Sequence, residues 1–333
     1  MANTINNSSD FLFLYEASQC NPNGDPDQEN KPRMDYDTKT NLVTDTRVKR
    51  FIRDYLKTIN EKEVIFVDME GERQVTMDAK LEAVVKRTLN DKSLIEKVFS
   101  DNEKAKKGYL ELLEKSKDEE AFWGKLKDKK LKETNVELLR YLVKEQFIDI
   151  RLFGSAFAVE GFTKAYTGPV QLNWGYSLNK VELMDSDSIV TIMNDDSSTF
   201  GKDYRVHYSL LAFNGTINKF AAKTTGLKEE DLKVFRDAIW NAIPAMPTRS
   251  KLNQYPKLYV ELIYNEGYTN GQFGDLRNYV SAQPKGELDE KKVRRFDDLV
   301  LDLSKLKTLI EEHKGKTIKD VIVRTSTDLE FSV

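Results

Sequence analysis

The sequence FLFLYEASQCNPNGDPDQ (residues 11–28), followed by NLVTDTRVKRFIRDYLKTI (residues 41–59), sets the architecture of the N-terminal part of this chain. Residues 10–18 form an alternating, largely apolar run, which is typical of a β-strand. The Asn, Pro, Gly and Asp residues after it favour a turn, because proline fixes φ and glycine or asparagine tolerates positive φ. Residues 45–58 have helical spacing, with Thr44 or Asp45 as the expected N-cap. The segment therefore predicts a strand, a turn-rich loop and a helix.

The predicted helix has two different faces when its residues are placed at about 100° intervals. The apolar face is formed by Val48, Phe51, Ile52, Tyr55, Leu56 and Ile59. The cations Arg47, Lys49, Arg50, Arg53 and Lys57 lie largely opposite, and we expect them to face solvent. Asp45 and Asp54 are the acidic residues of the helix, so a polyanion would supply the missing counter-charge. A solvated basic face with intramolecular salt bridges explains the same pattern.

Composition narrows the classes of function. The chain has 333 residues, 32% of them charged, and a net charge of −3, so any nucleic-acid binding must use a local basic patch. One cysteine and two histidines, His207 and His313, argue against a disulfide framework and against a Cys- or His-rich metal site. We expect no metal and no cofactor. Neither a signal peptide nor an apolar run of about 20 residues is found, which predicts a cytoplasmic protein that does not enter a membrane.

The remainder of the chain alternates between strand-like and helical segments. Residues 60–147 are rich in Lys, Glu and Leu at helical spacing and predict an inserted helical subdomain. The other expected elements are strands at 149–154, 168–176, 204–213 and 257–264 and a helix from 225 to 243 that ends before Pro244. Without the insert the order is β-α-β-β-α-β, the ferredoxin-like or RRM-type unit. We expect the last part to add strands at 299–303 and 320–323 and a helix at 304–313.

No catalytic constellation is recognisable. Asp25, Asp27, Asp35 and Asp37 invite a metal site, but their spacing does not match an EF-hand, and turn or capping roles explain them better. Cys20 lies alone beside a turn and is expected to be inert. His207 is expected to pack within a strand, and no serine-nucleophile motif is present. We therefore expect that the protein is not an enzyme.

Two further groups of residues are compatible with nucleic-acid binding. Arg249 and Lys251, with two hydroxyl residues, form the loop Thr248–Lys251 after Pro247, which suits phosphate contacts, although a polar turn explains it equally well. The aromatic residues Trp174, Tyr176, Phe200, Tyr204 and Tyr208 either stack on bases or belong to the core.

Five short blocks, taken in order, resemble the Cas-seven (Cas7) family of CRISPR-associated proteins, and specifically the Csh-type backbone subunit of type I-B Cascade. The blocks are residues 21–26, 41–50, 149–154, 168–171 and 248–251. The likeness covers roughly residues 10–57, 147–182 and 200–265, and it is weak over the helical insert and the C-terminal part.

The resemblance implies an α+β fold shaped like a hand, with an RRM-like palm, a helical fingers insert and a thumb hairpin. On this basis the first part of the palm covers residues 10–59 and the fingers cover 60–147. The palm continues at 148–184, and the thumb loop or hairpin covers 185–202. The rest of the palm covers 203–265, and residues 266–333 form a C-terminal extension of strands and a helix.

The resemblance also implies a function: a non-catalytic subunit of a type I CRISPR interference complex that binds the CRISPR RNA (crRNA). Several copies would line up along one guide, beside other Cascade subunits, and present it for pairing with target DNA. The implied RNA contacts are Arg47, Lys49, Arg50 and Arg53, then Arg249 and Lys251, with Met193 and Phe200 as wedges against bases.

Two alternatives to this function stand beside it. One is a metal-dependent ribonuclease of the related type III kind, which would use the loop aspartate Asp25 or Asp35. The other is a protein-interaction module without RNA.

Overall fold

The computed structural model describes residues 4–60, 65–70, 73–74, 76–184, 187–191 and 199–333. The chain divides into two compact units, each described here by itself. The sheet unit comprises Ile5–Tyr55, Val170–Lys219 and Lys233–Val333. The helical unit comprises Met1–Thr4, Leu56–Pro169 and Phe220–Leu232.

The sheet unit is built on β1 (Ser9–Cys20), which is buried over most of its length. β1 pairs antiparallel with β14 (Val206–Ile217) on one side and with β15 (Gln254–Tyr264) on the other, so that Phe13 lies between Phe213 and Tyr259. A strand with neighbours on both sides can be apolar throughout, and this explains the run FLFLY. The complete order is β18-β15-β1-β14-β11-β5-β4, and β10 also pairs with β14. The outer strands are β4 (Met34–Asp35), β5 (Thr40–Val43), β10 (Val170–Leu172), β11 (Gly175–Ser177) and β18 (Ile318–Thr325).

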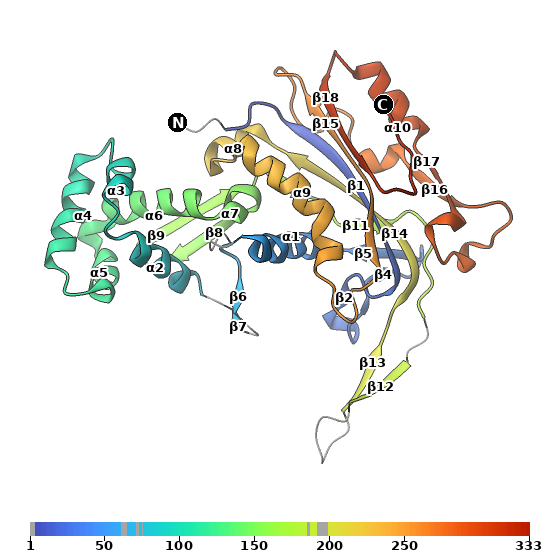
Figure 1. The fold of residues 1–333 in the computed structure, drawn as a ribbon, viewed down its shortest axis with the longest axis horizontal. Coiled ribbons are helices and arrows are strands. Elements are labelled where there is room, and N and C mark those ends of the chain that lie inside the picture. The colour runs from blue at the N-terminus through green and yellow to red at the C-terminus, as the bar shows by residue number, and fades with distance from the viewer. Residues whose placement is uncertain (1–3, 61–64, 71–72, 75, 185–186, 192–198) are drawn as a thin grey trace. The chain divides into compact units, whose positions relative to one another are not determined.

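Helices cover both faces of this sheet (Figure 1). On one face, the Phe11 ring lies 5.8 Å from the ring of Phe235 in α9 (Glu229–Ala245). The apolar residues of α1 (Asp45–Ile59), Phe51 and Ile52 among them, are buried as well. The alternate residues of β1 belong to the opposite core, together with α10 (Ser304–His313). The strands expected at 10–18, 168–176, 204–213 and 257–264 correspond to β1, β10–β11, β14 and β15, and the helices expected at 45–58 and 225–243 correspond to α1 and α9. This mixture of helix and sheet agrees with the predicted α+β class.

The helical unit packs around one aromatic core. Its helices are α2 (Met77–Thr88), α3 (Lys92–Val98), α4 (Glu103–Lys115), α5 (Glu119–Leu126), α6 (Lys132–Gln146), α7 (Ile148–Phe153) and α8 (Lys219–Thr225), and it includes the hairpin β8 (Gly154–Val159) and β9 (Phe162–Thr167). The rings of Phe66 and Phe157 lie 4.9 Å apart at the centre of this core. The helices predicted within residues 60–147 are therefore present.

Two details of the predicted secondary structure are wrong. Residues 149–154 were expected to form a strand, but all except Gly154 belong to α7, whose C-cap is Gly154 with a φ of +72°. The buried Asp149 carboxylate accepts hydrogen bonds from the backbone N–H groups of Phe66 (2.8 Å) and Val67 (3.1 Å). This tertiary contact favours a helix where the apolar residue types alone favoured a strand. In addition, α9 continues through Pro244 to Ala245.

The shorter elements complete the chain. Strands β12 (Asp187–Thr191) and β13 (Thr199–Asp203) form a hairpin within the segment 185–202. The remaining strands are β2 (Gly24–Asp25), β3 (Lys31–Pro32), β6 (Met69–Glu70), β7 (Arg73–Gln74), β16 (Ser281–Pro284) and β17 (Leu299–Asp302). Short 3-10 turns lie at Pro26–Gln28, Lys129–Leu131, Leu276–Tyr279, Glu290–Lys292 and Phe296–Asp298.

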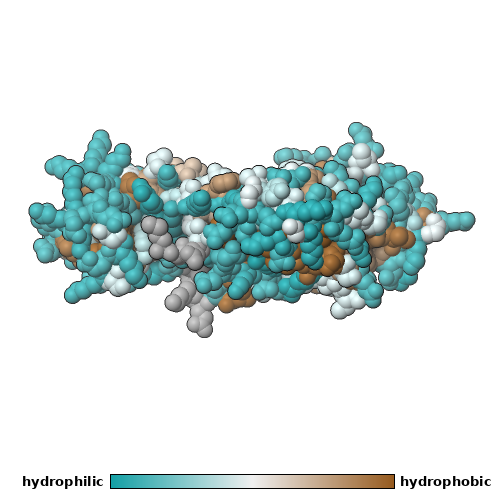
Figure 2. All heavy atoms as spheres, turned by 90° about the horizontal axis from the view of Figure 1, so that it is seen from above, coloured by the Kyte–Doolittle hydropathy of each residue, from teal (hydrophilic) through white to brown (hydrophobic). Residues whose placement is uncertain are grey.

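The surface agrees with the composition. In Figure 2 hydrophilic residues cover most of the visible face, with smaller hydrophobic areas between them. Among the helices of the described residues, none is long and apolar enough to cross a membrane.

Candidate nucleic-acid interface

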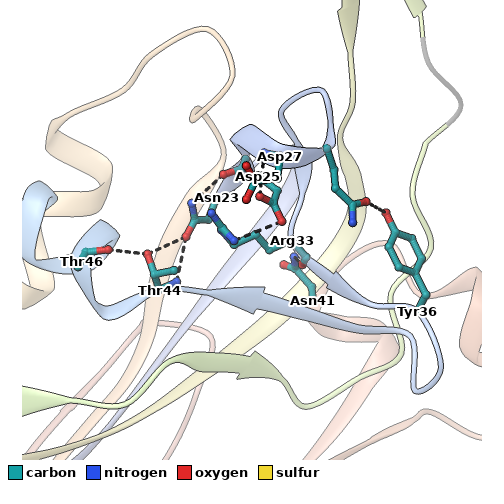
Figure 3. Close-up of polar contacts among 10 residues, drawn as sticks. Asn23, Asp25, Asp27, Arg33, Tyr36, Asn41, Thr44 and Thr46 are labelled. Atoms are coloured by element: carbon teal, nitrogen blue, oxygen red, sulfur yellow. Dashed lines mark hydrogen bonds and ion pairs between the residues drawn. The ribbon is translucent and has the colours of Figure 1, made fainter.

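The loop after β1 is tied to the first turn of α1 (Figure 3). Asn23 Oδ1 accepts hydrogen bonds from both the backbone N–H and the hydroxyl of Thr44, each at 2.9 Å. Thr44 Oγ1 in turn accepts the backbone N–H of Arg47 at 3.2 Å, which is the geometry of an N-cap. Thr44 is therefore the N-cap that the sequence suggested, and the Asn-Pro-Asn-Gly loop fixes where α1 begins.

The aspartates of this region have structural partners. Asp25 forms an ion pair with Arg33 at 3.2 Å and accepts the backbone N–H of Asp27 (Figure 3). Asp35 Oδ1 accepts the backbone N–H groups of Asp37 (3.0 Å) and Thr38 (3.3 Å). These contacts agree with the turn roles expected for both residues. In the part of the chain that the structure describes, no group of three or more His, Cys, Asp or Glu residues is placed to hold a metal ion.

Two cations from distant parts of the sequence meet beside this loop. Lys251 Nζ donates to the backbone carbonyl of Asn21 at 2.5 Å. The side chain of Arg47 is half-buried, with its guanidinium 3.9 Å from the centroid of the Phe51 ring. Burial lowers the pKa of Lys251 to about 8, and the positive charge of Arg47 contributes to this lowering. The two groups are therefore close enough to repel one another.

Neither of these two cations is neutralised by a carboxylate. Among the described residues, no ion pair is formed by Arg47 or by Lys251. Burial lowers the pKa of Arg47, and Asp54 opposes this effect, but the Asp54 carboxylate is already engaged by Arg50. Arg47 Nε is also buried without an acceptor. We call Arg47 and Lys251 the cation pair. Its uncompensated positive field would bind an anion such as a phosphate group.

Cys20, whose thiol is a potential nucleophile, lies at the end of β1. Cys20 is fully buried, and burial raises the pKa of its thiol to about 12. A thiol with this pKa carries almost no thiolate at neutral pH, which agrees with the inert role expected for it.

The other cations of α1 differ from their expected placement. Lys49 was expected to face solvent, but it is only 9% exposed and donates to Asp45 Oδ2 (3.0 Å) and Gln171 Oε1 (3.2 Å). Arg50 makes two contacts with Asp54, at 2.5 and 2.9 Å, and is half-buried. Arg53 is half-buried as well. The prediction of a solvent-exposed, unpaired row of cations is therefore wrong, because carboxylates at i,i+4 spacing neutralise Lys49 and Arg50.

The remaining predicted contacts lie near the hairpin β12–β13. Arg249 is exposed and forms an ion pair with Asp203 at 3.2 Å, and Asp203 also binds Arg205. Phe200 lies in β13 opposite Val190, and Met193 lies outside the described residues. Of the predicted contacts, Arg47 and Lys251 are the two that act on one another electrostatically.

Sequence reasoning missed the supporting residues. Asn21 and Asn23 were seen only as turn formers, yet Asn21 holds Lys251 and Asn23 holds the start of α1. At Asn23 the residue type was an available signal, since asparagine side chains commonly hydrogen-bond backbone groups. At Asn21 the backbone carbonyl makes the contact, so the residue type gave none.

Comparison with known proteins assigns this architecture to a family. The family model of CRISPR-associated protein Cas7 matches residues 7–304. A curated protein from Haloferax volcanii, described as CRISPR-associated protein Cas7, is 28% identical and aligns with 92% of this chain and 84% of its own length. A chain of a solved CRISPR RNA-guided surveillance complex in a pre-nicking state superposes with a TM-score of 0.53 at 12% identity. The superposition covers 98% of this chain and 94% of that one. At this identity the structural likeness concerns the fold alone.

Proposed function

Because the chain belongs to the Cas7 family of CRISPR-associated proteins, we propose that it is a crRNA-binding backbone subunit of an RNA-guided surveillance complex. The observation that carries the proposal is the cation pair: two partly buried positive charges with no carboxylate partner, held in place by the loop after β1. Such a site binds a ribose-phosphate backbone without reading bases. Sequence recognition is then left to base pairing between guide and target.

The finer assignment follows the type I-B, Csh-type resemblance. The palm is RRM-like, and the sheet order β15-β1-β14-β11 with antiparallel neighbours supports this, because it is the order of a ferredoxin-like unit. Residues 60–147 serve as fingers and the hairpin within 185–202 serves as the thumb. Copies of the chain assemble along one guide with other Cascade subunits and present it to target DNA. The subunit has no catalytic role.

The RNA contacts are ranked by charge compensation. Arg47 and Lys251 come first, because no carboxylate of the described residues forms an ion pair with them. Arg249 is next, since its exposed guanidinium could exchange Asp203 for a phosphate. Arg50, Arg53 and Lys49 contribute at longer range. Met193 and Phe200 act as wedges against bases.

The test of this function is RNA retention by the full-length chain co-expressed with a CRISPR array. The double variant Arg47→Gln/Lys251→Gln should lose the co-purifying RNA seen as excess absorbance at 260 nm. With single-stranded RNA added back, its log–log salt slope should be shallower by about 0.7 for each lost phosphate contact. The matched control is Lys307→Gln, an exposed cation on α10. Wild-type protein that carries no RNA, or a double variant with unchanged RNA and salt slope, would overturn the proposal.

The ribonuclease alternative has no specific observation in its favour. Asp25 is paired with Arg33, and Asp35 is engaged by the backbone of its own turn. A cleavage assay with Mg²⁺ separates the two functions. Robust cutting by the wild type that is lost in Asp35→Ala would favour the enzyme over the scaffold.

A further inference from the structure

Trp174 is an exposed aromatic residue next to the proposed RNA-binding region. Its side chain is 49% exposed, whereas Tyr208, another strand aromatic, is 1% exposed. Trp174 lies in the bend between β10 and β11. Because Gly175 pairs antiparallel with Val43, Trp174 is level with Thr44, the N-cap of α1.

The backbone around Trp174 is held by buried contacts. Its carbonyl accepts a hydrogen bond from Arg277 Nη1 at 2.7 Å, and the buried Arg277 is itself fixed by Asp275 at 2.6 Å. The preceding N–H, of Asn173, donates to the Asn214 carbonyl at 2.9 Å. A Cβ on Gly175 would lie 2.3 Å from the ring of Phe213, so only glycine fits at the following position. The exposed indole is therefore presented by a fixed backbone.

A planar cation accompanies the indole. The Arg33 guanidinium lies 5.7 Å from the centroid of the Trp174 ring, and its ion pair with Asp25 holds it there. The backbone N–H of Arg33 donates to the Asn23 carbonyl at 3.0 Å, so the loop that positions α1 also positions this cation. An aromatic face with a neighbouring positive charge is complementary to a nucleotide, which carries a flat base and a phosphate.

We propose that Trp174 forms a stacking site for one nucleobase of single-stranded RNA, with the Arg33 guanidinium bracing the indole. This inference rests on the proposed function and adds a base contact to a site that otherwise holds only backbone. The neighbouring Asn173 is exposed and polar, and Arg33 lies against the indole, so polar and charged groups border the exposed ring. Stacking tolerates every base, so the site adds affinity without sequence preference.

The test compares an ordinary RNA oligonucleotide with an abasic one of the same length. Trp174→Ala should weaken binding of the ordinary strand about five- to hundredfold, the range measured for loss of one stacked base. It should leave the affinity for the abasic strand and the salt slope unchanged, and Trp174→Phe should retain most of the binding. Tyr268→Ala, which removes another exposed ring of the sheet unit, should change neither affinity. Equal losses for both strands, or no loss for either, would overturn the stacking site. Wild-type protein that binds neither strand would instead overturn the proposed function.

Fluorescence gives a second readout that does not depend on affinity. Of the three tryptophans, Trp123 is 4% exposed and Trp240 lies under the guanidinium of Arg324. Saturating ordinary RNA should quench part of the emission, and saturating abasic RNA should not. The base-dependent quenching should be absent in Trp174→Phe. Quenching that persists in this variant would assign the stacked base to another ring.

Discussion

Two lysines, one in each unit, differ in the partner that their ammonium groups meet. In the helical unit, the side chain of Lys80 is 3% exposed and forms an ion pair with Asp68 at 3.0 Å. In the sheet unit, Lys251 is partly buried; it donates to the backbone carbonyl of Asn21, is repelled by Arg47, and forms no ion pair with any described carboxylate. A buried charge normally requires a counter-charge, since desolvation is otherwise unfavourable. Lys80 therefore serves the fold, whereas Lys251 has no carboxylate partner among the described residues and can accept an anion from outside.

The largest effect on stability is expected when Lys80 loses its carboxylate partner Asp68. Asp68→Ala removes the buried carboxylate that pairs with Lys80 and with Lys57, and should destabilise the helical unit by about 3–5 kcal/mol, measured by urea unfolding. The control is Asp78→Ala, which removes a more exposed ion pair with Lys127 and should cost less than about 1 kcal/mol. Equal losses in the two variants would show that burial does not distinguish them.

The cation pair should make RNA binding sensitive to pH. In the free protein the pKa of Lys251 is about 8, below its usual value, and a bound phosphate would raise it again. RNA binding above pH 8 therefore requires proton uptake, and affinity should fall by up to about tenfold per pH unit between pH 8 and 9.5. Lys251→Met should bind more weakly at pH 7 and show a flatter profile. Fluorescence anisotropy at constant ionic strength measures both, and parallel profiles would contradict the assignment.

The same shift has a consequence for folding. Because the pKa of Lys251 is lower in the folded state than in the unfolded chain, the unfolded state binds more protons between pH 8 and the usual lysine pKa. The stability of wild type relative to Lys251→Met should thus rise with pH through this window. A relative stability that falls or stays level would show that Lys251 is not desolvated.

The smallest effect is expected at the support of the cation pair. Thr44→Ala removes the N-cap of α1 and the partner of Asn23, and should cost about 1 kcal/mol of stability. Thr46→Ala removes a hydroxyl that donates only to Thr44 and should cost less. Thermal unfolding gives the stability difference, and RNA affinity should fall more in Thr44→Ala because Arg47 follows this cap. A Thr46→Ala variant as damaged as Thr44→Ala would argue against the cap.

The main elements of the sheet could be predicted because their signals are local. The apolar run of β1, the cap at Thr44 and the acidic first turn of α9 each reside in a few consecutive residues. The prediction of a strand at residues 149–154 failed, because the contact that decides their conformation joins Asp149 to a segment more than 80 positions away. Short apolar runs are ambiguous when such contacts are unknown.

The candidate site was predictable only in part. Asp45 and Asp54 were visible at i,i+4 spacing from Lys49 and Arg50, so the neutralisation of these two cations could have been weighted more strongly. The proximity of Arg47 and Lys251 could not be predicted from the sequence, because it depends on the antiparallel pairing of β1 with β15 and not on spacing along the chain.

The two borders of the central sheet bear on how copies of this protein can associate. β4 at one border is two residues long, and β18 at the other carries charged side chains, Lys319, Asp320 and Arg324 among them. Short or charged border strands are poor templates for a foreign strand. In the proposed assembly, neighbouring copies would therefore not join their sheets edge to edge through backbone hydrogen bonds. The number of subunits in the proposed assembly would then be set by the length of the bound RNA. Digestion of that RNA would dissociate the subunits.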